Sequence, residues 1–275
     1  MVRVTTLWVI GNSKETEKLC SELYERYKDK IPKEFQKSTV YRRGQLCLLL
    51  LPDSPELKEA MAFAEEHNMN PRYFSKVAFS PRETREALFF HVQSIPSPLE
   101  VECADLSDYG TKYTGGCPVC GLGKRVAGDV FVNRRLMKKH QLGYLNREYF
   151  VSERVKLLLE ESDLTGFHIG TQIKEYRGRE MPPYYLLEID SVLPPLSEST
   201  WIEPAGLQPC GHPWTLYNRS DLQYEREKLA NAKDFNCTQE ELNNYHTRDI
   251  IVSAKARTFL KENKIYARMV PLTIL

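Results

Sequence analysis

Two cysteines stand two residues apart in the segment YTGGCPVCGLGK, residues 113–124. Glycines flank the pair and a proline lies inside it, which lets the backbone fold around a metal ion with its N–H groups turned toward the sulfurs. A C-x-x-C turn supplies two thiolates to a tetrahedral site, so two more ligands must come from elsewhere. Cys117 and Cys120 therefore predict one half of a metal site.

The best second half is LQPCGHPW, residues 207–214. Cys210-Gly211 repeats the Cys-Gly step of the first pair, but Leu207 stands where a second C-x-x-C would place a cysteine. His212 offers a nitrogen in its place, and Cys103 and Cys237 are the other candidates for the fourth ligand. We predict a zinc-ribbon-like clamp in which Cys117, Cys120, Cys210 and His212 hold a structural Zn²⁺, because four protein ligands leave no open position for substrate.

Three other interpretations of the cysteine pair remain. If His212 is not a ligand, three protein ligands and a water would suit a zinc enzyme. A C-x-x-C pair is also redox-active in thioredoxin-like folds, where it begins a helix, but GLGK is a poor helix start. The pair is otherwise two small residues in a turn.

Composition limits the class of protein. The 275 residues include 38 Lys and Arg against 37 Asp and Glu, a net charge of +1, and the mean hydropathy is −0.47. This balance argues against a surface built for bulk nucleic-acid binding. Seven scattered cysteines do not form a secreted disulfide framework, and no apolar run is long enough to span a membrane. We expect a cytoplasmic protein without a signal peptide or a membrane partner.

The pattern of elements predicts an α+β fold with two domains. Residues 1–96 form a small α/β domain, with strands at 4–10 and 45–51 and a helix capped by Ser13. A capping box of Ser80 and Glu83 predicts a further helix that continues through Val92. Residues 94–100 are then a linker, and 97–275 are the zinc-containing α+β domain. In that domain, residues 194–215 contain five prolines and are expected to be irregular.

An internal repeat lies in the second domain. FVSERVKLLLEESDLTGFHI at 150–169 aligns with IVSAKARTFLKENKIYARMV at 251–270 without a gap, at an offset of 101 residues. Each copy has a serine N-cap, an apolar helical stripe and the start of a new strand. We predict two strand–helix–strand units, at about 150–170 and 251–271, that pack as a pseudo-symmetric pair.

These segments also resemble a known family. The order of CPVCG, FVSERVKLLLEESDLTGF and a later CG is similar to that of bacterial double-CxxCG proteins, which are classed as immunity proteins of polymorphic or contact-dependent toxin systems. The ending IVSAKARTFLKENKIYARMVPL resembles related immunity families. The resemblance covers about residues 100–275, and Leu207 departs from it. It implies a zinc-stabilised, non-enzymatic protein whose partner is a cognate toxin.

No catalytic residue is predicted. The histidines at 67, 91, 140, 168 and 246 have no nucleophile or acid at a telling spacing. Glu188 and Asp190 alternate on one strand and share a face, which suits acid–base work or simply the wet side of a sheet. Arg134, Arg135, Lys138 and Lys139 form one dense basic cluster, so a nucleic-acid-associated zinc ribbon is the alternative function and an uncharacterised zinc enzyme the third.

Overall fold

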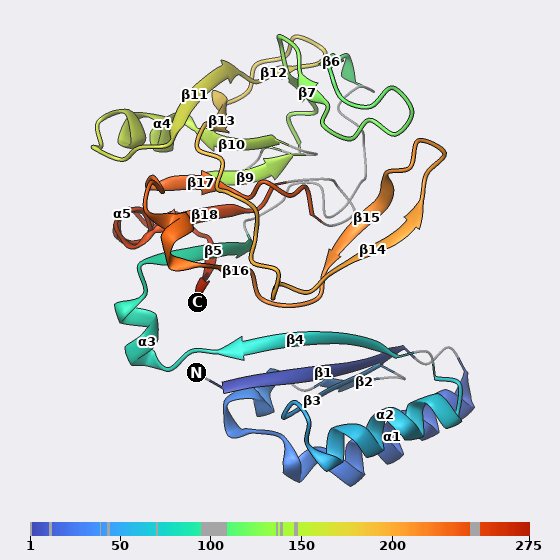
Figure 1. Cartoon of the computed structure of the whole chain (residues 1–275). Coiled ribbons are helices and arrows are strands. Elements are labelled where there is room, and N and C mark those ends of the chain that lie inside the picture. Colours follow the sequence, from blue (N-terminus) through green and yellow to red (C-terminus); the bar gives the residue numbers. More distant parts are fainter. Residues whose placement is uncertain are drawn as a thin grey trace. The chain divides into compact units, whose positions relative to one another are not determined.

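The computed structural model describes residues 2–10, 13–38, 40–42, 45–69, 71–94, 109–135, 137, 140–145, 148–242 and 248–275. The chain has an α+β fold, as predicted, and divides into two compact units. Unit 1 is Met1–Glu86 with Arg219–Asp221, and unit 2 is Ala87–Asn218 with Leu222–Leu275 (Figure 1). Across the described ranges, no helix is both long and apolar enough to cross a membrane.

Unit 1 contains an antiparallel sheet with two long helices. Its elements are β1 Val2–Ile10, α1 Lys14–Tyr27, two 3₁₀ turns at Lys28–Lys30 and Lys33–Ser38, β2 Val40–Arg42, β3 Gln45–Leu50, α2 Pro55–Glu66, β4 Arg72–Ala78 and α3 Pro81–Glu86. The strand order is β2-β3-β1-β4 with every neighbour antiparallel. Chain order and sheet order together give the ferredoxin-like, split βαβ arrangement.

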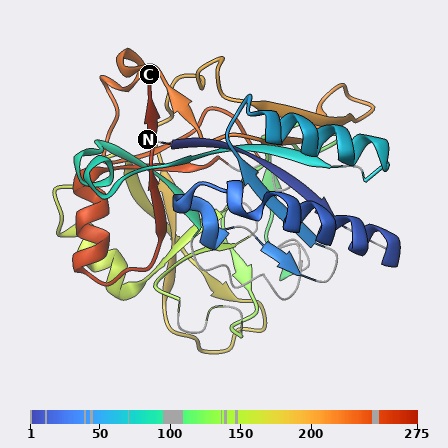
Figure 2. The same ribbon diagram turned by 90° about the horizontal axis from the view of Figure 1, so that it is seen from below.

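Local sequence explains the two long helices of unit 1. Ser13 and Ser54 are N-caps whose hydroxyls accept the N–H groups of Thr16 and Leu57. The apolar positions of α1 and α2 face the sheet and complete one core with the buried side chains of β1 and β3. Both helices therefore cover the same face of the sheet (Figure 2).

Unit 2 is built mainly of short strands. Its elements are β5 Phe89–Ser94, β6 Tyr113–Thr114, β7 Arg125–Val126, β8 Phe131–Val132, β9 Leu142–Leu145, β10 Glu148–Ser152, α4 Glu153–Glu160, β11 Phe167–Gln172, β12 Lys174–Glu175, β13 Tyr184–Ile189, β14 Ile202–Leu207, β15 Pro213–Asn218, β16 Gln223–Tyr224, a 3₁₀ turn at Arg226–Leu229, β17 Phe235–Cys237, β18 Ile250–Ser253, α5 Ala254–Glu262, β19 Arg268–Pro271 and β20 Thr273–Ile274. They form two four-stranded sheets and four two-stranded pairs.

The predicted third helix is shorter than its pattern suggested. The capping box is confirmed, since Ser80 and Glu83 exchange hydrogen bonds between side chain and backbone N–H. The helix nevertheless ends at Glu86, and the expectation of a helix through Val92 is wrong. The run Phe89-Phe90-His91-Val92 is rich in aromatic and β-branched side chains, and its backbone pairs with β18 on one side and β19 on the other. The compact units therefore divide after Glu86, ten residues before the boundary expected from the sequence.

The two repeated segments form the same strand–helix–strand unit. The first is β10-α4-β11 and the second is β18-α5-β19. Their sheets have matching orders, β9-β10-β13-β11 and β17-β18-β5-β19, with all neighbours antiparallel. The buried side chains of the two strand–helix–strand segments belong to one hydrophobic core. Helices α4 and α5 lie at the same end of the two sheets (Figure 1).

Hydrogen bonds repeat between the two halves. Arg154 and Lys255, which occupy equivalent positions, each donate to a backbone carbonyl in the loop after the other half's helix: Arg154 Nη2 to Asn263 O at 3.0 Å, and Lys255 Nζ to Asp163 O at 3.0 Å. Such reciprocal contacts are what a two-fold relation produces. The two strand–helix–strand segments of unit 2 thus pack as a pseudo-symmetric pair.

The central strand of the second half comes from a different place in the chain than that of the first half. In the first half the central partner of β10 is β13, which follows α4 in the chain. In the second half the equivalent place is taken by β5, which precedes both halves. The N–H groups of Glu153 and Ala254 donate to the carbonyls of Pro183 and Leu88, each just before its central strand. The second half is therefore a circularly permuted copy of the first.

The serine caps of this pair give a matched test. Ser152 accepts only the N–H of Val155, whereas Ser253 accepts the N–H of Ala256 and also donates to Asp234 Oδ1 at 2.7 Å. We expect Ser152→Ala to lower the free energy of unfolding by about 1 kcal/mol and Ser253→Ala by about 2 kcal/mol. Urea unfolding measures both. Equal losses would show that the Asp234 bond contributes nothing.

The proline-rich segment is more regular than expected. Residues 202–218 form the β14–β15 hairpin, in which Leu207 pairs with Pro213 and Ile202 with Asn218. The expectation of irregular structure through residue 215 is therefore wrong for its second part. Proline lacks only the N–H donor, so a two-stranded hairpin tolerates Pro204 and Pro213.

Candidate metal centre

The first cysteine pair lies in the loop between β6 and β7, residues 115–124, here called the knuckle loop. The N–H of Gly121 donates to Cys117 O, and the N–H of Cys117 donates to Leu122 O, both at 2.8 Å. Gly116 has φ +72°, and a Cβ there would lie 2.6 Å from Lys124 N, so only glycine fits. The loop thereby turns both cysteines to the same side.

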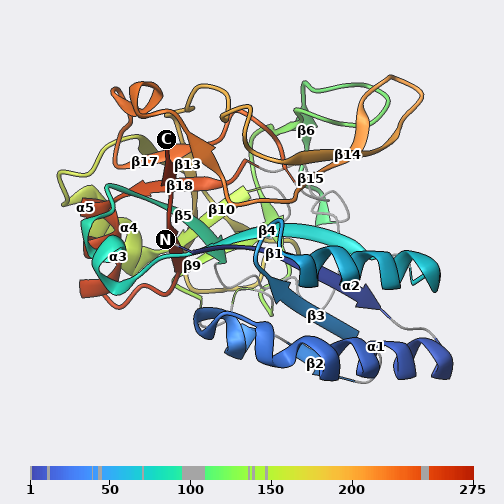
Figure 3. The same cartoon turned by 60° about the horizontal axis from the view of Figure 1, so that its bottom comes forward.

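The second pair lies at the tip of the β14–β15 hairpin. The N–H of Gln208 donates to His212 O and the N–H of Gly211 to Gln208 O, both at 2.8 Å, which closes the turn around Cys210. Gly211 has φ +81°, a conformation that favours glycine. The knuckle loop lies beside this tip in two views of the structure (Figures 1 and 3).

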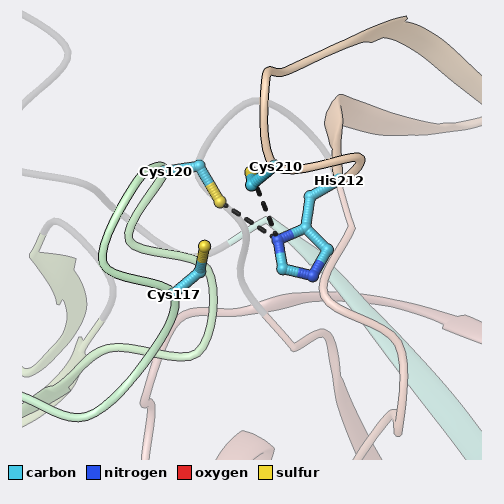
Figure 4. Close-up of side chains that lie close together, drawn as sticks. All are labelled: Cys117, Cys120, Cys210 and His212. Carbon is cyan, nitrogen blue, oxygen red and sulfur yellow. Dashed lines mark hydrogen bonds between the residues drawn. The ribbon is translucent and has the colours of Figure 1, made fainter.

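The four predicted side chains meet at one point. The ligand atoms of Cys117, Cys120, Cys210 and His212 all lie within 4.8 Å of one another, and all four residues are half-buried. His212 Nδ1 lies 3.3 Å from Cys120 Sγ and 3.6 Å from Cys210 Sγ. The sulfurs of the knuckle loop and the imidazole nitrogen point toward the same centre (Figure 4). Within the described part of the chain this is the one group of its kind that can hold a metal ion.

The backbone of the knuckle loop favours the thiolate form at one ligand. The N–H groups of Cys120 and Val119 stabilise the charged sulfur of Cys117 and lower the pKa of that thiol from 9.0 to about 6. At Cys120 the N–H of Leu122 lowers the pKa, but burial and the neighbouring thiols outweigh it, so this pKa is raised. A thiolate at Cys117 near neutral pH is the form that binds metal ions.

The carboxylate of Glu241, which the sequence did not indicate, accepts hydrogen bonds from the knuckle loop and from β7. Glu241 Oε2 accepts the N–H of Gly123 at 3.2 Å, and its Oε1 accepts from Arg125 Nη2 at 2.9 Å. Glu241 is 116 residues from Arg125 in the chain, so no local pattern indicated this contact. The loop is therefore held in place by groups other than a metal ion.

Of the other two candidate ligands, only Cys237 lies within the described residues, and it is placed elsewhere. Cys237 belongs to β17, is 5% exposed and is not a member of the group, and Cys103 lies outside the described residues. Leu207 is 72% exposed at the end of β14. Cys120 is followed by a turn and then β7 rather than by a helix, so the pair lacks the helix N-terminus of thioredoxin-like redox sites.

Exposed apolar side chains flank the four ligands. Val119 stands between the two knuckle cysteines and is 61% exposed, and Trp214 follows His212 by two residues and is 60% exposed. Leu207 and Trp214 extend from opposite faces of the hairpin, because Leu207 pairs with Pro213 whereas Trp214 lies over Gly206. The exposure of these three residues was not evident from the sequence.

The acidic pair predicted on one strand face has a histidine between its members. His168 Nδ1 lies 2.7 Å from Asp190 Oδ1, and His168 Nε2 lies 3.2 Å from Glu188 Oε2. The expectation that His168 is isolated is therefore wrong. β11 and β13 are antiparallel neighbours that place His168 opposite Glu188, which no spacing in the sequence reveals.

This cluster predicts a measurable shift. The hydrogen bond to Asp190, followed by the charge of Glu188, raises the pKa of His168 above its ordinary value of 6.5. The stabilisation from the charged ring is fully present below pH 6.5 and is lost as the pH rises through the raised folded-state value. We expect Asp190→Asn to lower the His168 pKa, as followed by NMR titration of the ring protons. An unchanged titration curve would contradict the contact.

The sequence was also compared with known proteins. No protein-family model matches the chain, and no curated protein matches it in sequence.

Proposed function

We propose that Cys117, Cys120, Cys210 and His212 bind a structural Zn²⁺. We further propose that the chain is a non-enzymatic protein-binding protein of the bacterial cytoplasm, namely an immunity protein that neutralises a cognate toxin by direct binding. The zinc part is supported by the chemistry of the donors. Three sulfurs and one imidazole nitrogen form a Cys₃His set, which is typical of structural zinc. Soft thiolate ligands disfavour Mg²⁺ and Ca²⁺.

The spacing of the donors also suits zinc. Zn–S and Zn–N bonds of about 2.3 and 2.0 Å give a sulfur–nitrogen edge of about 3.5 Å in a tetrahedron. The sulfur–nitrogen distances of 3.3 and 3.6 Å lie on either side of that edge. Four protein ligands fill a tetrahedral ion, which supports a structural over a catalytic role. The ion would tie the knuckle loop to the β14–β15 hairpin.

The proposal that the chain binds a protein rests on the exposed apolar side chains beside the four ligands. A clamped loop and hairpin would hold Val119 and Trp214 on a rigid frame, so little conformational entropy is lost when a partner covers them, while Leu207 extends from the other face of the hairpin. An exposed tryptophan is a frequent centre of binding energy in protein interfaces. The resemblance to double-CxxCG immunity proteins points to a toxin as the partner.

The test uses the product of the neighbouring reading frame in the native genome, because immunity genes lie beside their toxin genes. We expect co-expression of the chain to restore growth of cells that produce the neighbouring protein, and the two proteins to copurify. Trp214→Ala should weaken the complex about 30-fold, corresponding to the loss of ~2 kcal/mol at an interface hot spot.

Tyr266→Ala is the matched control, since Tyr266 is 68% exposed and lies in the loop after α5. It should leave both growth and affinity unchanged. A neighbouring protein that neither binds nor inhibits growth, or equal losses for the two variants, would count against the proposed function, while the zinc content is tested separately below.

A further inference from the structure

A group of arginines gathers where two distant segments pair in parallel. β8 pairs with β12, and the N–H of Tyr176 continues this pairing to Val132 O at 3.1 Å. The pairing brings Arg134 and Arg135, which follow β8, to Arg177 and Arg179, which follow β12. All four side chains are exposed, and Arg134 Nη1 reaches Glu180 O at 3.4 Å. These four residues are called the arginine surface below.

The turn that carries Arg177 and Arg179 is stabilised by the buried carboxylate of Glu175. Glu175 is 7% exposed, and its Oε2 accepts the N–H groups of Arg177 at 2.7 Å and of Arg179 at 3.0 Å. Gly178, with φ +69°, donates to Glu175 O at 2.9 Å. The carboxylate is thus used by the backbone, and both guanidinium groups project from a rigid turn.

The local charges leave the arginine surface positive. Lys174, the other cation of this segment, is paired with Asp129 at 2.6 Å. Among the described residues, no carboxylate lies within ion-pair distance of the four arginines, and the one carboxylate whose charge acts on Arg179 and Arg134 is that of the buried Glu175. Lys138 and Lys139, the other members of the basic cluster seen in the sequence, lie outside the described residues.

A pair of tilted tyrosine rings adjoins the arginines, although no aromatic residue stands next to Arg134 in the sequence. The ring centroids of Tyr109 and Tyr176 lie 4.9 Å apart, and Arg177 Cζ lies 4.8 Å from the Tyr176 ring. Because Arg177 is exposed, its guanidinium group is accessible to a further flat group. Nucleic-acid bases stack on such guanidinium planes, and phosphates accept from the remaining forks.

We propose that the arginine surface binds single-stranded nucleic acid, with phosphates on Arg134, Arg135 and Arg179 and a base stacked on Arg177. An acidic protein would need the charges alone, whereas a guanidinium group over a tyrosine ring, together with three further exposed arginines, suits the bases and phosphates of a single strand. This activity goes beyond the proposed protein binding and does not depend on it.

The test is fluorescence anisotropy of the full chain with labelled 12-nucleotide RNA and DNA strands of mixed sequence, at several salt concentrations. With three phosphate contacts, log K should fall with log salt at a slope of about −2. Arg177→Ala/Arg179→Ala should weaken binding at least about tenfold at low salt and reduce the slope by ~1. Arg177→Lys, which keeps the charge but removes the plane, should weaken binding without changing the slope.

Lys261→Ala/Arg268→Ala is the control, because it removes the same charge from exposed positions in and after α5. It should bind like the unaltered chain, and all variants should keep the same melting temperature. The proposal fails if the strands do not bind at 50 mM salt, if the control loses as much affinity as the arginine pair, or if a polyglutamate peptide binds as tightly as the RNA.

Discussion

Loss of one ligand at the hairpin tip should remove the metal ion and destabilise the second unit. We expect Cys210→Ser and His212→Ala each to reduce bound zinc from one ion per chain to a small fraction. The free energy of unfolding should fall by about 4 kcal/mol, as is usual when a structural metal is lost. For a unit of this size the melting temperature should drop by roughly 8–16 °C. Metal analysis by mass spectrometry and calorimetry measure the two effects.

Two further variants separate ligation from packing. Leu207→Ser changes an exposed neighbour on the same hairpin and should leave zinc content and melting temperature unchanged. His212→Cys supplies another soft ligand at the same position and should retain zinc, since Cys₄ and Cys₃His sites are both common. If His212→Ala keeps full zinc and full stability, the fourth ligand has been assigned wrongly.

Truncation of one side chain in β5 should have an effect of similar size. Phe90 is fully buried between Val252 and Pro271 of the neighbouring strands, and the guanidinium of Arg257 lies 4.2 Å from its ring centroid. We expect Phe90→Ala to cost about 3–5 kcal/mol, the usual loss for a buried phenylalanine. Hydrogen exchange should show β17, β18 and β19 losing protection while β1 and β3 of unit 1 keep theirs.

Leu88→Ala is the control for this variant. Leu88 is 54% exposed and two residues away, and its substitution leaves its carbonyl free to accept the N–H of Ala254. It should cost less than about 0.5 kcal/mol. Loss of protection in unit 1 rather than unit 2 would contradict the placement of β5 and restore the domain boundary expected from the sequence.

The errors made from the sequence have a common origin. The capping box at Ser80 and Glu83 was read correctly because it is a contact over three residues. The end of that helix was predicted wrongly, because Phe90 pairs in a sheet with Val252, which is far along the chain, instead of continuing the helix. The contacts of His168 could not be predicted for the same reason, since Glu188 and Asp190 become its neighbours only through the register of β11 and β13.

The α+β class, the serine-capped helices of the repeat and the donor types of the candidate metal centre could all be predicted from the sequence. Each of these follows from local periodicity, capping or donor chemistry, which short segments express on their own. Three features depend instead on tertiary structure: β5 completes the second half of the pair, His212 rather than Cys237 lies with the three cysteines, and the segment after β12 lies beside the segment after β8. These contacts depend on strand pairing between residues that are tens to more than a hundred positions apart, and pairing of that kind is set by the packing of the whole unit.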